Sequence, residues 1–471
     1  MRRLALPAIF ATLAASCSKD PPPPVGSPVT PSSAAAGPAA HAATSGSPSP
    51  AGARGSAGAT GVVGAAAGWV PARPPTPPGL PKDSNVILLS IDSLRADMPW
   101  NGYPRPIAPR LTDLEKRAVT FTHAYSVSSY TSMSLGGLLA GRLPSELIRS
   151  GWFFGTYKND LFFPKLLQQN AIRTMGVMAH MYFKTAGFDY GFDDWRLVPG
   201  ITFDPNTDRD ITSPAHEKVS EEMLGDPAND SRRFFFWAHF LDPHDLYQRH
   251  DGIDWGPNPR DRYDGEVQFT DQYVGKLLDF IAARSWAART VIIVTADHGE
   301  EFGEHGMTRH GFEVWETLVH VPLMIIAPGA KPRHVEPMRS GIDLAPTILE
   351  LFGLSSEPSF EGKSLVGEVY GAPDEERDVI VDLPTTSDSG RRRALLHQNE
   401  KLICADNDNA CRVYDLTADP GEKAPYIHGS AYVDMKARYD AVAETIKEVA
   451  PYACGADCLN TAYRTKKDEA Q

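Results

Sequence analysis

The chain has 471 residues, with 46 Lys and Arg against 59 Asp and Glu, for a formal net charge of −13. This acidic balance argues against nucleic acid as a partner and indicates no basic face for a membrane surface. The length would suit two or three average domains, but the first eighty residues are too poor in large apolar side chains to form a core.

The N-terminus has the pattern of an export signal. Arg2 and Arg3 precede an apolar run over residues 4–15, which suits a signal peptide and is too short to span a bilayer. The run ends in L-A-A-S-C, which resembles the lipobox of bacterial lipoproteins. We therefore expect residues 1–16 to be removed and Cys17 to be the lipidated first residue of the mature protein. The alternative is an ordinary signal peptide that is cleaved nearby.

Residues 17–82 consist mostly of Pro, Ala, Gly and Ser. Such a segment buries too little apolar surface to offset the entropy of ordering, so we expect a disordered tether. A lipid anchor and a tether together predict a protein of the bacterial cell envelope. It would be held on a membrane, in the periplasm or at the cell surface.

From residue 84 onward, short apolar runs alternate with longer amphipathic stretches. This pattern predicts an α/β fold with a mostly parallel central sheet flanked by helices. The expected strands cover residues 86–91, 234–241, 291–295 and 323–327, and the expected helices cover 107–119, 270–284 and 343–354. We expect a catalytic domain over residues 83–355 and a smaller C-terminal subdomain over 356–471, closed by a helix at 432–449.

Polar residues follow three of the predicted strands. Asp92 follows the first, Asp242 and His244 follow the second, and Asp297 and His298 follow the third. Open α/β sheets bind their ligands at the carboxyl ends of the strands. One such Asp would most often be a helix cap, but three at one edge predict a catalytic site.

These residues suit the hydrolysis of phosphate or sulfate esters. Asp92, Asp297 and His298 form a mixed oxygen and nitrogen set for one divalent metal ion, which could be Ca²⁺, Zn²⁺, Mn²⁺ or Mg²⁺. Thr131 precedes a predicted helix over residues 133–139, so its hydroxyl would face free backbone N–H groups. Coordination to the metal would turn this weak nucleophile into an effective one. The alternative is that Thr131 only caps the helix.

Ordered motifs then indicate a family. N-V-I-L-L-S-I-D-S-L-R-A-D, G-L-L-A-G-R-L-P, D-P-H-D-L-Y, T-A-D-H-G-E-E-F-G-E-H-G and V-P-L-M-I-I-A-P-G resemble the sulfatase family of the alkaline-phosphatase superfamily. V-Y-D-L-T-A-D-P resembles that family's closing subdomain. The resemblance implies an alkaline-phosphatase/sulfatase-like fold, with Asp92, Thr131, Asp297 and His298 at the metal and Thr131 as the nucleophile.

The resemblance also implies roles around this centre. It implies that His244 and His310 contact the transferred group or protonate the leaving oxygen, and that Arg95 orients the nucleophile loop. For the other polar residues of these motifs we expect structural roles. Packing or support is expected for His239, Asp242 and His305, and a solvated loop face is expected for Glu300, Glu301 and Glu304.

The chain departs from the sulfatase pattern at the nucleophile. Sulfatases carry C-x-P-S-R or S-x-P-S-R, whose first residue becomes formylglycine, whereas this chain has T-S-M-S-L from Thr131 to Leu135. Ser93 stands where the family often has a second Asp. These departures favour a hydrolase or transferase of phosphoesters or phosphodiesters. The alternatives are a sulfatase that acts without formylglycine and a non-catalytic surface lipoprotein that retains the fold.

The substrate is expected to be a small-molecule, glycan or lipid ester, selected by loops over residues 147–160 and 187–230. The C-terminal region adds four cysteines, Cys404, Cys411, Cys454 and Cys458. In an exported protein this even number predicts two disulfides. A structural zinc site is the alternative.

Overall fold

The computed structural model describes residues 75–452, apart from residues 152–154, 158–159, 203–208, 388 and 407. The predicted signal peptide, Cys17, Cys454 and Cys458 lie outside the described residues. Among the helices of the described part, none is both long enough and apolar enough to cross a membrane. Leu80, near the end of the segment predicted to be a tether, is buried in the hydrophobic core.

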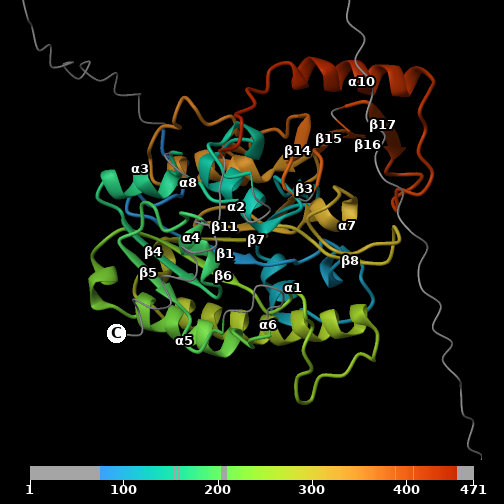
Figure 1. The fold of residues 1–471 in the computed structure, drawn as a ribbon. Helices are drawn as coiled ribbons and strands as arrows, with labels where there is room; N and C mark the ends of the chain where they lie inside the picture. Colours follow the sequence, from blue (N-terminus) through green and yellow to red (C-terminus); the bar gives the residue numbers. More distant parts are fainter. Residues whose placement is uncertain are drawn as a thin grey trace, which may run out of the picture. The chain divides into compact units, whose positions relative to one another are not determined.

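A mostly parallel eight-stranded sheet forms the centre of the fold, as predicted (Figure 1). Strand β11 runs antiparallel to both of its neighbours, β2 and β7. The order across the sheet is β12 (Arg333–Val335), β2 (Val119–Phe121), β11 (Leu323–Ile326), β7 (Thr290–Ala296), β1 (Asn85–Ile91), β6 (Phe234–Phe240), β4 (Arg173–Met178) and β5 (Asp194–Leu197).

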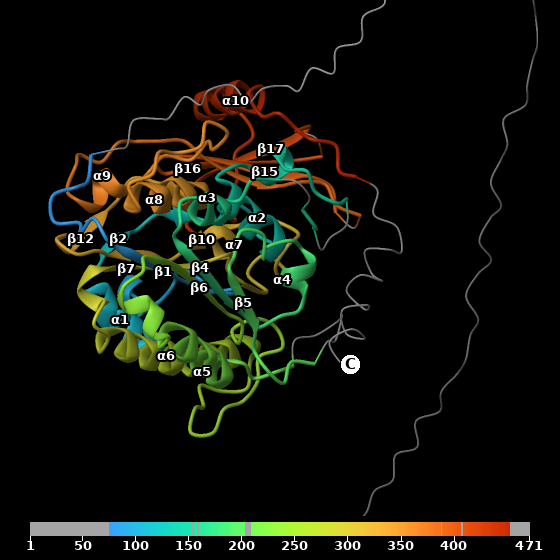
Figure 2. The same cartoon turned by 90° about the vertical axis from the view of Figure 1, so that its left-hand side faces the viewer.

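Helices cover both faces of this sheet (Figure 2). One face packs against α1 (Pro109–Glu115), α5 (Ser213–Leu224) and α6 (Pro259–Ala282). The other packs against α2 (Thr131–Ala140), α3 (Phe163–Gln169) and α8 (Leu344–Leu351). Because both faces are covered, all seven residues of β1 and of β6 are buried, and these strands are almost continuously apolar in sequence.

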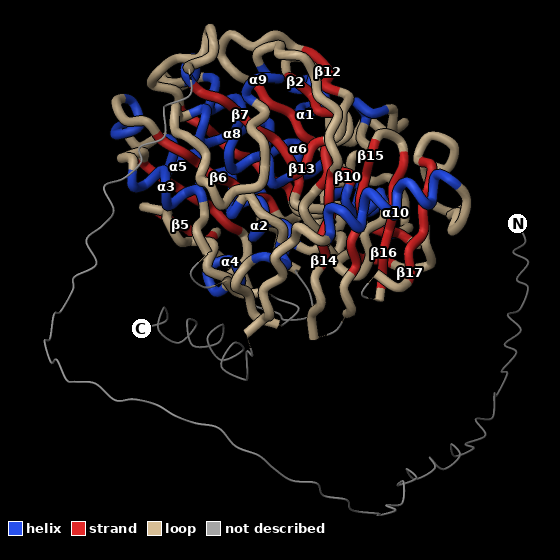
Figure 3. Tube along the Cα trace, turned by 90° about the horizontal axis from the view of Figure 1, so that it is seen from above, coloured by secondary structure: helices blue, strands red, loops and turns tan. Residues whose placement is uncertain are grey.

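The C-terminal region adds a second, antiparallel sheet of β14 (Val379–Leu383), β15 (Arg392–His397), β16 (Glu400–Ala405) and β17 (Ala410–Asp415). Helix α10 (Ser430–Ala443) lies across it, with Met435 and Tyr439 buried against the strands (Figure 3). A disulfide joins Cys404 and Cys411, which face each other on β16 and β17. This confirms one of the two predicted disulfides.

Short elements complete the described part. They are α4 (Tyr182–Thr185), α7 (Glu316–Val319), α9 (Val366–Val369), the strands β3 (Ala124–Tyr125), β10 (His320–Val321) and β13 (Arg339–Ser340), the hairpin of β8 (Glu301–Phe302) and β9 (Thr308–Arg309), and the 3-10 helices Pro99–Asn101, Pro144–Glu146, Pro227–Asp230, Ala287–Arg289 and Gly341–Asp343.

Two regions differ from the sequence predictions. The helix expected over residues 270–284 is only the second half of α6, which begins at Pro259 because Asn258 and Asp261 form a capping box there. The stretch expected to be a loop over residues 187–230 instead contains β5 and α5. Neither element shows strong apolar periodicity, since β5 is only half-buried and α5 is rich in charged residues.

Candidate active site

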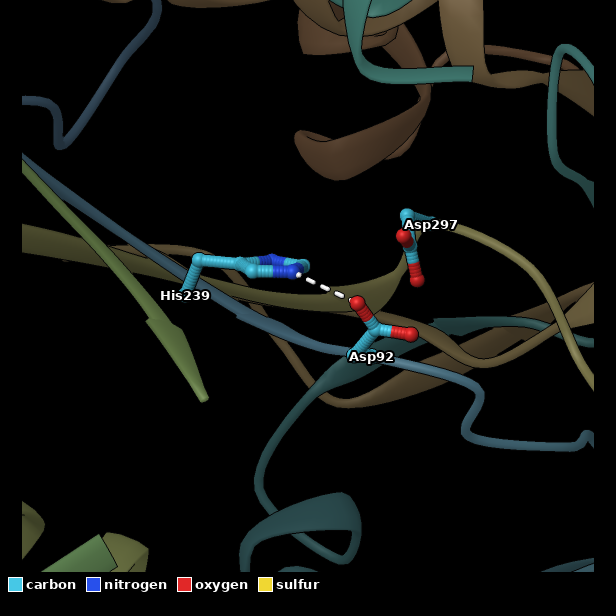
Figure 4. A group of neighbouring side chains, drawn as sticks. All are labelled: Asp92, His239 and Asp297. Carbon is cyan, nitrogen blue, oxygen red and sulfur yellow. Dashed lines mark hydrogen bonds and ion pairs between the residues drawn. The ribbon is translucent and has the colours of Figure 1, made fainter. Parts of the chain in front are cut away.

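Three buried side chains meet where neighbouring parallel strands end. Asp92 directly follows β1, Asp297 directly follows β7, and His239 is the next-to-last residue of β6 (Figure 4). One ligand-type atom from each lies within 4.8 Å of the other two. Nε2 of His239 lies 3.1 Å from Oδ2 of Asp92. The sequence predicted the two aspartates at this edge but assigned His239 only to packing or support.

The charges of this group call for a cation. Burial, together with the charge of Asp92, raises the pKa of Asp297 well above its usual value. Burial also opposes ionisation of Asp92, but nearby histidines, His244 first, hold its pKa below the usual range. Oδ2 of Asp297 is buried and has no hydrogen-bond partner among the described residues. An unpaired buried carboxylate oxygen beside a second carboxylate fits a divalent metal, which would offset both charges.

Thr131 is the first residue of α2 and faces this group. Its Oγ lies 2.9 Å from Nε2 of His298. Tyr130 occupies the N-cap position, so Thr131 is not the helix cap that was the alternative to a nucleophile. Nδ1 of His298 bonds the carbonyl oxygen of Gly299 at 2.9 Å. A carbonyl only accepts, so Nδ1 carries the proton and Nε2 presents its lone pair.

His298 also borders the aspartates. Its Nε2 lies 3.4 Å from Oδ2 of Asp297 and 3.8 Å from Oδ1 of Asp92. Burial and the neighbouring His310 lower the pKa of His298 well below its usual value, so the ring is neutral. A neutral imidazole suits a metal ligand or a proton acceptor. The predicted set of Asp92, Thr131, Asp297 and His298 therefore lies together, with His239 in addition.

Two further histidines line the same place. The ring of His310 lies 4.1 Å from that of His298 and 4.9 Å from that of His244, between ring centroids. Nδ1 of His310 lies 3.1 Å from Oε1 of buried Glu300. The structure thus groups His244 and His310 with His298, whose Nε2 contacts Thr131.

Of the three acidic residues expected on a solvated loop face, only Glu304 is exposed. Glu300 and Glu301 are fully buried, so that expectation was wrong for both. Each glutamate pairs with a histidine. Glu300 pairs with His310, as described above, and Oε1 of Glu301 lies 2.8 Å from Nδ1 of His305. These pairings keep buried carboxylates hydrogen-bonded, which burial requires.

Arg95, which was expected to orient the loop of Thr131, forms its hydrogen bonds and ion pairs with other described residues. Its guanidinium pairs with Asp97 at 2.9 Å and Glu304 at 2.6 Å and donates to the carbonyl oxygen of Glu300 at 2.9 Å. Arg95 therefore ties the segment after β1 to the loop after β7. Asp242, close to His244 in sequence, instead accepts hydrogen bonds from the backbone N–H groups of Thr212 and Ser213 at the start of α5.

His239 was the functional candidate that the sequence missed. Every residue of β6 is buried, so alternation between polar and apolar positions gives no clue to the face on which His239 lies. The available signal was the strand pairing, because Ser90, two residues before Asp92, lies opposite His239 across β1 and β6.

A mostly parallel α/β sheet has paired aspartates at its carboxyl edge, facing a helix-terminal hydroxyl and histidines, and this arrangement suits a metal-dependent hydrolase. Residues 84–354 match the model of the sulfatase family, and residues 303–448 match the model described as N-sulphoglucosamine sulphohydrolase, C-terminal. The chain belongs to the sulfatase family.

Individual relatives agree with this assignment. A sulfatase of Formosa agariphila is 23% identical over 422 residues, covering 72% of this chain and 82% of that protein. An ulvan-active sulfatase of the same organism is 24% identical over 351 residues, covering 63% of this chain and 67% of that protein. The solved phosphonate monoester hydrolase of Silicibacter pomeroyi superposes with a TM-score of 0.61 and 20% identity, covering 77% of this chain and 94% of that chain.

Proposed function

We propose that this protein is a metal-dependent sulfatase that hydrolyses sulfate esters with Thr131 in the position of the formylglycine. The match of residues 84–354 to the sulfatase model, together with the buried group of Asp92, His239 and Asp297 within that range, supports this proposal. It replaces the preference for phosphoesters that the sequence motifs first suggested. Family membership also argues against the non-catalytic alternative.

The residues fit a divalent metal held by Asp92 and Asp297, with Nε2 of His298 left to accept the proton of Thr131. When bound, such an ion supplies positive charge for the ester oxygens and lowers the pKa of a coordinated hydroxyl. The chain's own groups then divide the remaining tasks. Oγ of Thr131 attacks the sulfur, forms an ester with it and displaces the leaving alcohol. Water hydrolyses the Thr131 ester and releases sulfate.

The histidines handle the protons. The neutral Nε2 of His298 already accepts the hydrogen bond of the Thr131 hydroxyl and can take its proton. His310 and His244 lie together on the same side of the site and are placed to protonate the leaving oxygen. General-acid catalysis of this kind contributes roughly 100- to 10,000-fold in rate.

The substrate class we propose is a sulfated glycan, supported by the relative whose name describes action on ulvan. The test is a parallel assay of the purified protein on sulfated oligosaccharides and on nitrophenyl esters of sulfate, phosphate and phosphodiester. Sulfate release that is lost in Thr131→Ala supports the proposal. Turnover of phosphate esters without sulfate release overturns it.

Phosphoryl transfer is the second candidate, and the identity of residue 131 favours it. Threonine cannot be converted to formylglycine, but it can form a phosphothreonine that passes its phosphoryl group to water or another alcohol. Mass spectrometry of the protein trapped with substrate distinguishes the two candidates. Phosphate on Thr131 supports phosphoryl transfer, and sulfate on Thr131 supports the sulfatase.

We further propose that the enzyme acts in the cell envelope, held to a bacterial membrane through Cys17. The L-A-A-S-C sequence supports this, and a tether of about 60 residues rich in Pro, Ala, Gly and Ser would give the domain reach. Metabolic labelling with palmitate tests it. Label in the wild-type chain and none in Cys17→Ala is the expected result, and a soluble, unlabelled wild-type chain would contradict it.

A further inference from the structure

The metal group lacks an oxygen ligand that its family often supplies. Ser93 stands in place of a second aspartate after Asp92, and its hydroxyl donates to Oδ1 of Asp92 at 2.9 Å. Ser93 therefore supports an existing ligand and adds no carboxylate. A site for Ca²⁺ normally gathers six to eight oxygens, so this loss weakens the case for a hard cation.

His239 fills the space beside Asp92 from the opposite strand. Its ring has no exposed surface, and its Nε2 lies 3.1 Å from Oδ2 of Asp92. Figure 4 shows the ring directed from β6 toward the two carboxylates. This separation is close to that of neighbouring ligands around one ion, about 3.0 to 3.4 Å for metal–ligand bonds of ~2.1 Å. His239 thus occupies a ligand's place by geometry.

A hydrogen-bond chain behind the ring prepares it for this role. Nε1 of Trp237 donates to Oγ of Ser90 at 2.8 Å, and that oxygen lies 2.7 Å from Nδ1 of His239. A hydroxyl oxygen has two lone pairs, so Ser90 can accept from Trp237 and from Nδ1 at once. Without an ion, Nε2 donates to Oδ2 of Asp92, whereas the tautomer in which Nδ1 donates to Ser90 leaves the lone pair of Nε2 for an ion held between the ring and the carboxylates. Histidines that bind metals almost always donate their other N–H in this way.

We propose that His239, fixed by Ser90 and Trp237, is a metal ligand of this enzyme, and that the centre therefore selects Zn²⁺ or Mn²⁺ over Ca²⁺ or Mg²⁺. The inference rests on the metal-dependent function proposed above. Two carboxylates with His239 give a mixed nitrogen and oxygen set. Imidazole suits zinc and other transition metals, whereas carboxylates and water alone suit magnesium and calcium.

The test measures metal binding directly on the full-length protein. The purified chain is stripped with a chelator and titrated separately with Zn²⁺, Mn²⁺, Ca²⁺ and Mg²⁺. Bound metal is counted by mass spectrometry, and imidazole ligands are counted by X-ray absorption. The main variant is His239→Gln, which places an amide near the position of Nε2. The matched control is His250→Gln, because His250 is also a buried histidine but pairs with Glu266 and stacks on Phe269.

We expect the wild type to bind one Zn²⁺ or Mn²⁺ per chain more tightly than Ca²⁺. His239→Gln should weaken Zn²⁺ by more than about tenfold and remove one imidazole, with Ca²⁺ affinity changed far less. Ser90→Ala, a small change that keeps the fold if His239→Gln does not, should weaken Zn²⁺ by roughly 10- to 100-fold. Tighter binding of Ca²⁺ by the wild type, or variants with unchanged Zn²⁺ affinity and imidazole count, would overturn the proposal. These readouts need no turnover, so they stand apart from the test of sulfate hydrolysis.

Discussion

Oγ of Thr131 lies 2.9 Å from Nε2 of His298, where the start of helix α2 meets the end of strand β7. A second bond fixes this meeting, since Oγ of Ser134 donates to the carbonyl oxygen of Asp297 at 2.6 Å. The two contacts hold the first turn of the helix against the residues that follow the strand. The hydroxyl of Thr131 is therefore positioned by the fold before any substrate binds.

If Thr131 is the nucleophile, its replacement should abolish turnover without removing the metal. We expect Thr131→Ala to lower kcat/KM by about a thousandfold or more, because no other group can form the covalent ester. Thr131→Ser keeps a hydroxyl and should stay within roughly tenfold of the wild type. Steady-state kinetics and metal counting on the three proteins check this. A Thr131→Ala protein that keeps more than a tenth of the activity would exclude a covalent role.

Glu300 should matter through His310. Its buried carboxylate holds Nδ1 of His310 at 3.1 Å and so sets which ring nitrogen carries the proton. We expect Glu300→Gln to lower kcat by roughly 10- to 100-fold, a part of the full general-acid effect, with KM changed little. The carboxylate of Glu313, which pairs with Arg392, supplies the control Glu313→Gln.

A double variant of Glu300 and His310 distinguishes the positioning role of Glu300 from a merely structural role. If Glu300 acts through His310, Glu300→Gln should add little to the loss already seen in His310→Ala. Independent, multiplying losses in the double variant would contradict the positioning role.

The sequence was sufficient to predict that the site lies at the carboxyl edge of the sheet, but not to predict every residue of the site or every strand. Asp92 and Asp297 could be placed together because each follows a strongly apolar strand, and parallel strands end at one edge. His239 could not be placed, because a strand buried on both faces has no informative alternation. Strand β4, with the sequence R-T-M-G-V-M, was missed because Met and Gly give little strand signal. Glu300 and Glu301 are buried with His310 and His305, which lie after and within the β8–β9 hairpin, and the sequence did not reveal this hairpin.

Asp271 should make stability depend on pH. It is buried in α6 and accepts hydrogen bonds from the backbone N–H groups of Arg110 and Leu111, and burial raises its pKa to about 6. The folded state therefore binds this proton more tightly than the unfolded state, in which the pKa of Asp271 is near the ordinary value of 3.8. The stabilisation that protonated Asp271 gives to the folded state is fully present below pH 4 and is lost as the pH rises to about 6.

The measurement is the free energy of unfolding of wild type minus Asp271→Asn at several pH values. This difference should fall by at most about 3 kcal/mol between pH 4 and pH 6 and then level off. Asp279→Asn, a change at an exposed position of the same helix, serves as the control. A difference that is flat across this window would show that Asp271 titrates normally.

Lys401 should be important for stability at the contact between the C-terminal sheet and the rest of the fold. It is fully buried, and its Nζ lies 2.9 Å from carboxylate oxygens of both Glu316 and Glu422. Lys401→Met would leave two buried carboxylates without their cation, at a cost of roughly 3 to 5 kcal/mol. Lys436→Met removes the half-exposed Lys436–Asp440 pair of α10 and should cost about 0.5 kcal/mol or less. Equal midpoints of chemical unfolding for the two variants would refute this contrast.

The disulfide between Cys404 and Cys411 should stabilise the C-terminal sheet modestly. The two residues are 7 apart in sequence, so the bond closes a short loop. The loss of chain entropy in the unfolded state for such a loop corresponds to about 2.5 kcal/mol. Cys404→Ala/Cys411→Ala should lower the free energy of unfolding by about that amount, and a reducing agent should destabilise the wild type by more than it destabilises this variant. Cys454 and Cys458 are the remaining cysteines of the C-terminal region, so a further loss of stability on reduction of the double variant would indicate that the second predicted bond exists. Peptide mapping of the unreduced protein checks which cysteines are joined, and a free thiol at Cys404 in the exported protein would contradict the prediction.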